Sequence, residues 1–262
     1  MNLAFNDLKG SVPDFSSQLQ LSVLDLSHNY FWSPLPRFSS SLRILTLAEN
    51  SFFGPISHLC GILSANNSLN YLDLSSNHLS GDIPDCWQHG QSLVILNLAN
   101  NTFSGQIPNS IGQLVNLYTL RLDNNILSGE VTLSLKNCIA LRVLGLARNR
   151  LLGNILAWIG DNLQNLMILE LRSNTFRGRI PLQMCQLKNL KILDLASNNL
   201  SGTIPRCVFL GMTSTDSRDT LSLVYYPYTT YFDEIVLTVK YREYEYRQPI
   251  LHYMTLLDLH GL

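Results

Sequence analysis

The sequence is poor in charge of either sign and contains no long apolar run. Charged residues make up 14% of its 262 residues and the formal net charge is −1, so the overall charge indicates neither a basic nor an acidic partner. Lysine and arginine form no stripe that could follow a phosphate backbone, which argues against nucleic-acid binding. No hydrophobic segment approaches the roughly 20 residues that a membrane-spanning helix needs.

The first ten residues, MNLAFNDLKG, have no positively charged leader followed by an apolar segment, so we do not expect a signal peptide there. Two expectations are then open. Either the protein is cytosolic, or its secretion signal and membrane anchor lie outside these 262 residues. The repeat pattern favours the second expectation.

Motifs of catalysis are missing as well. The sequence has no phosphate-binding glycine-rich loop, no HExxH zinc motif, no nucleophile elbow and no kinase signature. Its six histidines are scattered, which is typical of solvated loop residues rather than of a base or a metal ligand. We therefore expect a protein that is not an enzyme and that carries no cofactor and no metal.

What the sequence does contain is a repeat of about two dozen residues. The motif LxxLxLxxN ends at eight asparagines, and a shortened copy ends at Asn6. A leucine or phenylalanine follows two residues after every one of these nine asparagines, and glycine follows four residues after eight of them. Agreement at so many positions is not chance. The eight asparagines of the complete copies are Asn29, Asn50, Asn77, Asn101, Asn125, Asn149, Asn174 and Asn198.

The repeat predicts a structure in which each copy forms one coil. The two leucines of LxL point to the same face of a short strand, inward, because they are two residues apart. About five buried apolar side chains contribute on the order of 10 kcal/mol per coil, most of it offset by chain entropy, so coils should fold only when stacked. The buried asparagine needs hydrogen-bond partners and is expected to form a ladder with neighbouring coils. We predict an α/β-type repeat solenoid, curved, with one parallel sheet on the concave face and irregular or 3-10 segments on the convex face.

The repeats resemble a known family. The stretches YLDLSSNHLSGDIPDCW (71–87) and ILDLASNNLSGTIPRC (192–207) are similar to the plant-type leucine-rich repeat with its LxGxIP extension. The landmarks IPDCW, AWIGDNL, QMCQL and IPRC follow in the order seen in plant receptor-like proteins of the ethylene-inducing-xylanase receptor class. The resemblance covers residues 1–205. It implies a glycosylated ectodomain on the extracellular face of the plasma membrane, anchored only by a C-terminal helix that this chain lacks, with no kinase of its own.

The resemblance also implies a function. We expect a fragment of a receptor ectodomain that senses an extracellular elicitor, peptide or protein in defence or development and signals through a partner receptor kinase. One alternative is the ectodomain of a true leucine-rich-repeat receptor kinase, which only further C-terminal sequence would distinguish. Another is a secreted polygalacturonase-inhibitor-like wall protein, which the insertion described next argues against. A truncated product without its own function is a third.

The repeat period fails near the C-terminus. We divide the chain into nine repeats over 1–205, the first truncated, a tyrosine-rich island over 206–253 and the start of a further, truncated repeat over 254–262. The stretch EIVLTVKYREYEY (234–246) partly alternates, which predicts a half-buried strand. In the receptor-like family such an island contributes to ligand or co-receptor contacts in several members; the other interpretation is a strand packed on the solenoid edge. The island contact candidates are Tyr241, Tyr244 and Tyr246.

Four of the five cysteines lie nine to eleven residues after the ladder asparagine of their coil, in two pairs of adjacent coils. Coil spacing fits the Cα separation of a disulfide, so we expect the bridges Cys60–Cys86 and Cys185–Cys207 and an oxidising compartment. Five reduced core cysteines are the alternative, and Cys138 is expected to be a buried thiol. The sequons that could carry glycans are Asn66, Asn100 and Asn199.

Strand alternation points the residues two and four before each ladder asparagine outward on the concave sheet. We predict ligand recognition there, with charges setting selectivity; the other interpretation is a solvated sheet face. Reversing the charges of Arg121 and Arg172 together is expected to weaken signalling without unfolding. The ligand-binding candidates, with Arg148 beside the sheet, are Asp73, Asn97, Arg121, Asp123, Arg148, Glu170, Arg172 and Asp194.

Overall fold

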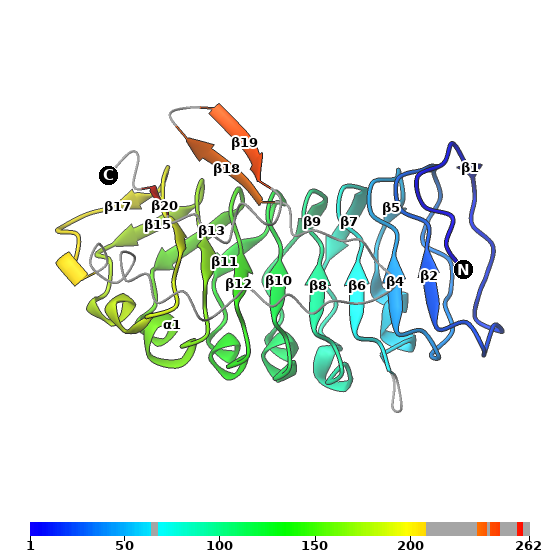
Figure 1. Ribbon diagram of the computed structural model, residues 1–262, viewed down its shortest axis with the longest axis horizontal. Helices are drawn as coiled ribbons and strands as arrows, with labels where there is room; N and C mark the ends of the chain where they lie inside the picture. The colour runs from blue at the N-terminus through cyan, green and yellow to red at the C-terminus, as the bar shows by residue number, and fades with distance from the viewer. Residues whose placement is uncertain (64–67, 208–234, 240–241, 247–255, 259–262) are drawn as a thin grey trace.

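The computed structural model describes residues 1–63 and 68–207 with their side chains, and residues 235–239, 242–246 and 256–258 by backbone alone. The chain winds into coils that lie side by side along its longest axis (Figure 1). Nine of the described strands, one from each coil after the first, form a single parallel sheet. In order across the sheet they are β2 (Val23–Asp25), β4 (Ile44–Thr46), β6 (Tyr71–Asp73), β8 (Ile95–Asn97), β10 (Thr119–Arg121), β12 (Val143–Gly145), β14 (Ile168–Glu170), β16 (Ile192–Asp194) and β20 (Leu256–Asp258).

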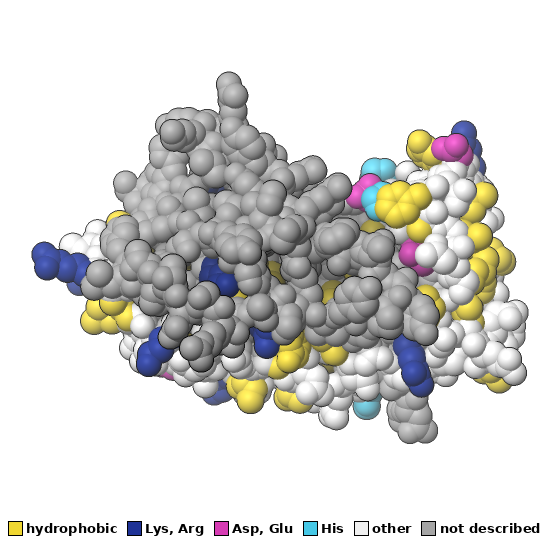
Figure 2. Space-filling model, viewed as in Figure 1, with side chains coloured by type: hydrophobic (Ala, Val, Ile, Leu, Met, Phe, Trp, Pro, Cys, Tyr) yellow, Lys and Arg dark blue, Asp and Glu magenta, His cyan; other side chains and the backbone are white. Residues whose placement is uncertain are grey.

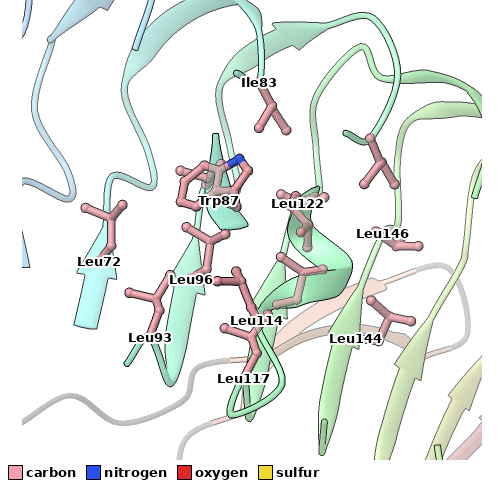
Figure 3. Packing of buried hydrophobic residues seen from close by; sticks show 14 of the residues in the cluster. Leu72, Ile83, Trp87, Leu93, Leu96, Leu114, Leu117, Leu122, Leu144 and Leu146 are labelled. Atoms are coloured by element: carbon pink, nitrogen blue, oxygen red, sulfur yellow. The ribbon is translucent and has the colours of Figure 1, made fainter. Parts of the chain in front are cut away.

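The register of this sheet places each repeat position beside the same position in the next coil. Leu120 of β10 lies between Leu96 of β8 and Leu144 of β12, and all three leucine side chains are fully buried. The second leucine of each LxL pair lies in the same interior, as Leu122 and Leu146 do. Figure 3 shows Leu96, Leu122, Leu144 and Leu146 among the side chains that fill one shared interior, together with Trp87. The expected solenoid is therefore confirmed, and its core runs unbroken through the stack.

The sequence prediction of one sheet was incomplete, because a second row of short strands runs along the flank of the coils. These flank strands follow each ladder asparagine, where the chain passes from one face of the coil to the other. They pair in parallel through bonds such as that from the Ile126 amide to the Phe103 carbonyl, at 2.9 Å. Their sheets are β1-β3, β5-β7-β9 and β11-β13-β15-β17. Their bounds are β1 (Lys9–Gly10), β3 (Tyr30–Phe31), β5 (Phe53–Gly54), β7 (His78–Asp82), β9 (Thr102–Ser104), β11 (Ser128–Glu130), β13 (Arg150–Asn154), β15 (Thr175–Gly178) and β17 (Asn199–Leu200).

Short helical turns form the side of the coils opposite the large sheet (Figure 1). Five are 3-10 turns, as the repeat predicted, and one is an α-helix, which the sequence analysis missed. The α-helix falls in a repeat whose ladder asparagines are 25 residues apart rather than 24, so an extra residue is available to complete the turn. The described elements are η1 (Ser57–Gly61), η2 (Trp87–His89), η3 (Asn109–Gln113), η4 (Leu133–Asn137), α1 (Ala157–Asn162) and η5 (Leu182–Gln186).

The asparagines form a continuous ladder between coils. The Nδ2 group of Asn125 donates to the carbonyl oxygens of Leu122 and Asp123 in its own coil and of Leu98 in the preceding coil, each at 3.1 Å. Its Oδ1 atom accepts the amide of Phe103, also in the preceding coil, at 2.9 Å. Each amide thus satisfies groups in two coils at once, which the burial of backbone polar groups requires.

A left-handed turn precedes every rung of this ladder. The residue directly before each ladder asparagine has a φ between 52° and 57°, although none of these nine residues is glycine. Such conformations cost energy for most residue types, so the ladder hydrogen bonds that follow must hold them. The nine residues are Phe5, His28, Glu49, Ser76, Asn100, Asn124, Arg148, Ser173 and Ser197.

The insertion contains two described strands where the sequence predicted one. β18 (Ile235–Val239) and β19 (Arg242–Tyr246) pair in antiparallel fashion, with Leu237 opposite Tyr244. The alternation over 234–246 gave no sign of a turn, because no glycine, proline, asparagine or aspartate interrupts it. After the insertion β20 pairs with β16, and Leu257 lies beside Leu193. The strand of the next repeat therefore continues the large sheet in register.

We expect Asn125→Ala to destabilise the protein by about 2–4 kcal/mol, because it leaves the buried Phe103 amide without its partner and removes the hydrogen bonds that Asn125 donates to three carbonyl groups. Asn116→Ala is the control. Asn116 also donates to a carbonyl of the preceding coil, that of Gln91 at 2.9 Å, but in an exposed position, so its loss should cost under about 1 kcal/mol. Urea unfolding followed by circular dichroism measures both values, and equal losses would contradict the role of the ladder.

Candidate ligand-binding face

The outward side of the nine-stranded sheet, here called the sheet face, carries five of the eight predicted ligand-binding residues in one row. The row consists of the last residue of each strand, which lies beside the last residue of the neighbouring strands. The strand spacing of roughly 4.8 Å brings these side chains into contact across coils. From β6 to β16 the row reads Asp73, Asn97, Arg121, Gly145, Glu170 and Asp194.

At one end of this row the polar side chains hold the backbone. Asp73 Oδ1 accepts the amide of Ser75 at 2.9 Å, and Asn97 Oδ1 accepts the amide of Ala99 at 3.2 Å. The Asn97 side chain also donates to Asp73 Oδ2 at 3.1 Å. Burial raises the pKa of Asp73, while its hydrogen bonds oppose that rise. Asp73 and Asn97 therefore stabilise the ends of their own strands.

The middle of the row is a charge network that spans three coils. The Arg121 guanidinium contacts Asp123 Oδ2 at 3.2 Å within its own coil. It also contacts Glu170 Oε2 at 3.2 Å, although β12 lies between β10 and β14. An arginine can reach past a whole coil because the intervening residue, Gly145, has no side chain.

Gly145 makes room for a second group as well. A Cβ atom at this position would lie 2.2 Å from Asp123 Oδ2, so the Asp123 carboxylate occupies the space that any other residue would fill. From there Asp123 Oδ1 accepts the amide of Ala147 in the next coil at 3.0 Å. Sequence reasoning missed this arrangement, although the signal was present. Among the eight strand-end positions from β2 to β16, only this one is glycine.

The network continues toward β16. Arg172 Nε contacts Asp194 Oδ2 at 2.7 Å, and Asp194 Oδ1 accepts the amide of Ala196. Burial raises the pKa of the Glu170 carboxyl to about 8, the guanidinium of Arg121 opposes this rise, and the carboxylates of Asp123 and Asp194 add to it. The charge state of the Glu170 carboxyl therefore depends on the neighbouring guanidinium and carboxylate groups.

Arg148 lies beside the network, at the left-handed turn before Asn149, and its charge lowers the pKa of Glu170. The structure therefore brings the predicted cluster together, but its members differ in how far they are buried. Asn97, Arg121, Asp123 and Arg148 are half-buried, whereas the remaining candidates are buried. The buried candidates are Asp73, Glu170, Arg172 and Asp194.

The structure bears on one expectation about this cluster, that reversing the charges of Arg121 and Arg172 leaves the fold intact. Each guanidinium is paired with carboxylates that are themselves largely removed from solvent, so we expect this reversal to destabilise the protein as well. A glutamate at either position would place like charges together, which is costly at buried sites. A test of recognition must therefore remove both charges of a pair.

The other predicted residues lie away from the sheet face. The structure joins Cys60 to Cys86 and Cys185 to Cys207, with Cα separations of 5.7 and 5.4 Å. Cys138 is a buried free thiol, and burial raises its pKa to about 12.

The candidate sites of modification and contact outside the core are only partly described. The sequons at Asn100 and Asn199 are exposed. Asn66 and Tyr241 lie outside the described residues, and Tyr244 and Tyr246 are described only as backbone positions of β19. None of the described helices is long and apolar enough to cross a membrane. Within the described residues no cluster of histidine, cysteine, aspartate and glutamate is arranged to hold a metal ion.

The comparisons with known proteins agree with this architecture. Family models described as leucine-rich repeat match residues 67–127 and 189–209. Receptor-like protein EIX2 of Solanum lycopersicum is 44% identical over 269 residues, which cover 99% of this chain and 26% of that protein. The chain therefore spans about a quarter of the length of this relative.

Solved structures of plant receptors are similar as well. The plant peptide hormone receptor RGFR1, solved in complex with RGF2, aligns with a TM-score of 0.71 and 31% identity over 81% of this chain and 34% of its own. The Arabidopsis receptor kinase HAESA, solved with the peptide hormone IDA and the co-receptor SERK1, aligns with a TM-score of 0.67 and 31% identity over 78% and 38%.

The stacked coils, the asparagine ladder and these matches show that the chain belongs to the leucine-rich repeat proteins. Within that class its similarity is to the plant receptor-like proteins, whose repeats form extracellular ectodomains.

We expect Gly145→Ala to destabilise the protein by about 1–3 kcal/mol, because the new methyl group displaces the Asp123 carboxylate. Gly61→Ala is the matched control, since a Cβ atom there meets no other atom within 4 Å and its φ is not positive. The control should change stability by no more than about 1 kcal/mol. Thermal unfolding compares the melting temperatures of the two variants. Equal melting temperatures would show that the space at Gly145 is not required.

Proposed function

We propose that this chain is part of the ligand-recognition ectodomain of a plant cell-surface receptor-like protein and that its sheet face binds an extended peptide or protein segment. On this proposal the protein senses an extracellular elicitor or peptide and signals through a partner receptor kinase. The observation that supports it most is the charge network around Arg121. The network and the half-buried residues beside it lie on one continuous sheet. An extended peptide can follow this sheet because the distance between neighbouring strands is constant.

The relatives support the kind of ligand and of partner. Among the solved structures with the same fold, the peptide hormone receptor RGFR1 holds RGF2, and HAESA holds the peptide hormone IDA together with the co-receptor SERK1. The match to a tomato receptor-like protein favours a receptor without its own kinase, with the receptor-kinase ectodomain as the second candidate. The family of the tomato relative is ligand-binding rather than catalytic, which supports a non-enzymatic role for this chain.

Chemistry on the flanks supports an extracellular location. Two disulfides join adjacent coils, and such bridges persist in oxidising compartments rather than in the cytosol. The exposed sequons Asn100 and Asn199 can accept glycans without disturbing the core. Asn100 lies at the left-handed turn beside the sheet face, so a glycan there would border the proposed ligand site.

Selection from random peptides tests this proposal while the natural ligand is unidentified. A displayed library of random peptides is selected on the immobilised chain, and the enriched peptides are measured against Arg121→Gln/Glu170→Gln. This double variant removes both charges of the Arg121–Glu170 pair, while Asp123, which also contacts Arg121, keeps the hydrogen bond from the Ala147 amide. We expect selected peptides to bind it at least tenfold more weakly than the unchanged chain, a loss of about 1.4 kcal/mol.

The control is Glu130→Gln/Lys136→Gln, which removes the same two charges from exposed residues on the flank and the helical side. Its affinity for the peptides should be unchanged. If no peptide is enriched, or if both double variants bind equally well, the sheet face is not the recognition surface.

A further inference from the structure

Three aromatic side chains lie exposed on the flank of two adjacent coils, well apart from the sheet face. Tyr30, Trp32 and Phe53 are 57%, 63% and 41% exposed, and we call them the flank patch. Tyr30 belongs to β3 and Phe53 to β5, near the N-terminal end of the stack (Figure 1). Hydrophobic side chains are also visible over the coils at this end in the space-filling view (Figure 2).

The core does not require these rings. Phe31 and Phe52, which alternate with them along the chain, point inward and are buried. The flank patch has a described coil on each side, because the Trp32 amide donates to the Gly10 carbonyl at 3.1 Å and Phe53 lies opposite His78 in β7. Its exposure therefore does not result from an open end of the stack.

Other coils show that polar residues suffice at the same positions. The flank patch occupies places one and three residues after a ladder asparagine. The serines three residues after Asn77, Asn101 and Asn125 are Ser80, Ser104 and Ser128. Only Ile126 and Leu152 are exposed large apolar residues at equivalent positions among the remaining described coils, and both are aliphatic. At these two positions, tyrosine, tryptophan and phenylalanine thus occur only in two neighbouring coils.

The backbone sets the spacing of the residues that carry the three rings. Tyr30 and Trp32 lie on the same side of one extended segment, about 6.6–6.8 Å apart along the chain, and the next coil is roughly 4.8 Å away. Pro34 lies opposite Phe53 and joins the two coils at this point. The Lys9 ammonium lies 5.7 Å from the centre of the Tyr30 ring, a cation–π contact that holds this ring in place.

The size of the flank patch argues against a stable protein interface. Rings of this kind have about 150–250 Å² of surface each, so at the observed exposures they present on the order of 300–400 Å². A stable protein partner covers about 800 Å² on each side. The flank patch is large enough for a few stacked rings of a small ligand, and the neighbouring side chains at equivalent positions, Ser51 and Ser80, offer hydroxyl groups.

We propose that the flank patch binds a neutral, β-linked oligosaccharide. The C–H groups on the face of a sugar ring carry partial positive charge and are attracted to the negative face of an aromatic ring. An extended chain of such sugars presents its faces in succession, so it can contact exposed rings on one extended segment and on the next coil. A neutral saccharide fits better than an acidic one, because Lys9, the cation beside Tyr30, already contacts that ring. This site is separate from the proposed peptide site, and either can exist without the other.

Titration of the whole chain with cellohexaose and with xylohexaose tests the proposal, with tryptophan fluorescence and calorimetry as readouts. Trp87 is fully buried and Trp158 is 9% exposed, so Trp32 is expected to dominate the change in fluorescence. Trp32→Ser and Phe53→Ser should each weaken binding at least tenfold. Both should fold, since serine occupies the position of Trp32 and Phe53 in four other coils. Leu152→Ser, at the equivalent position of a later coil, should bind as the unchanged chain does.

Three results would overturn this inference. One is the absence of saturable binding of either hexasaccharide at millimolar concentration. Another is equal weakening by Leu152→Ser and Trp32→Ser, which would indicate a general loss of structure. The third is concentration-dependent self-association in sedimentation that Trp32→Ser abolishes, which would make the flank patch a contact between copies of the chain.

Discussion

A buried asparagine amide must find partners for two donors and one acceptor, and the only partners within reach are backbone groups of its own and the preceding coil. At Asn125 these are the carbonyl groups of Leu98, Leu122 and Asp123 and the amide of Phe103. This requirement fixes the distance and register between coils. It also holds the left-handed turn before each rung, which residues such as Glu49 and Arg148 would not adopt without it.

The fixed register determines what the sheet face can do. Neighbouring strand ends lie roughly 4.8 Å apart, so charges in the row meet directly and must be paired. The pairing of Arg121 with Glu170 past Gly145 shows how one missing side chain extends a contact over three coils. A network of this kind is rigid, and rigidity in the unbound state lowers the entropic cost of binding an extended partner.

Repeat positions were predictable because one physical cause acts at each of them. The leucines of LxL had to point inward and the asparagines had to bridge coils, so strands and ladder could be placed from spacing alone. The flank strands were missed because their pairing uses backbone groups, which leave no side-chain pattern. The pairing of Arg121 with Glu170 was missed for another reason. Whether Arg121 can reach Glu170 depends on residue 145, which lies one coil away in space and 24 residues away in sequence. The insertion has no repeat at all, and its alternation gave no sign of two strands.

Hydrogen exchange at single residues tests the ladder most directly. The amides that donate to a ladder Oδ1 atom should exchange slowest with solvent, although they lie at the turn beyond the large sheet. Those described are the amides of Leu8, Phe31, Phe52, Leu79, Phe103, Leu127, Leu151 and Phe176. We expect protection comparable to that of the sheet amides from Phe31 through Leu151, with less at the two ends of the series. Exchange of the Leu79, Phe103 and Leu127 amides at the rate of exposed loop residues would show that no such ladder exists.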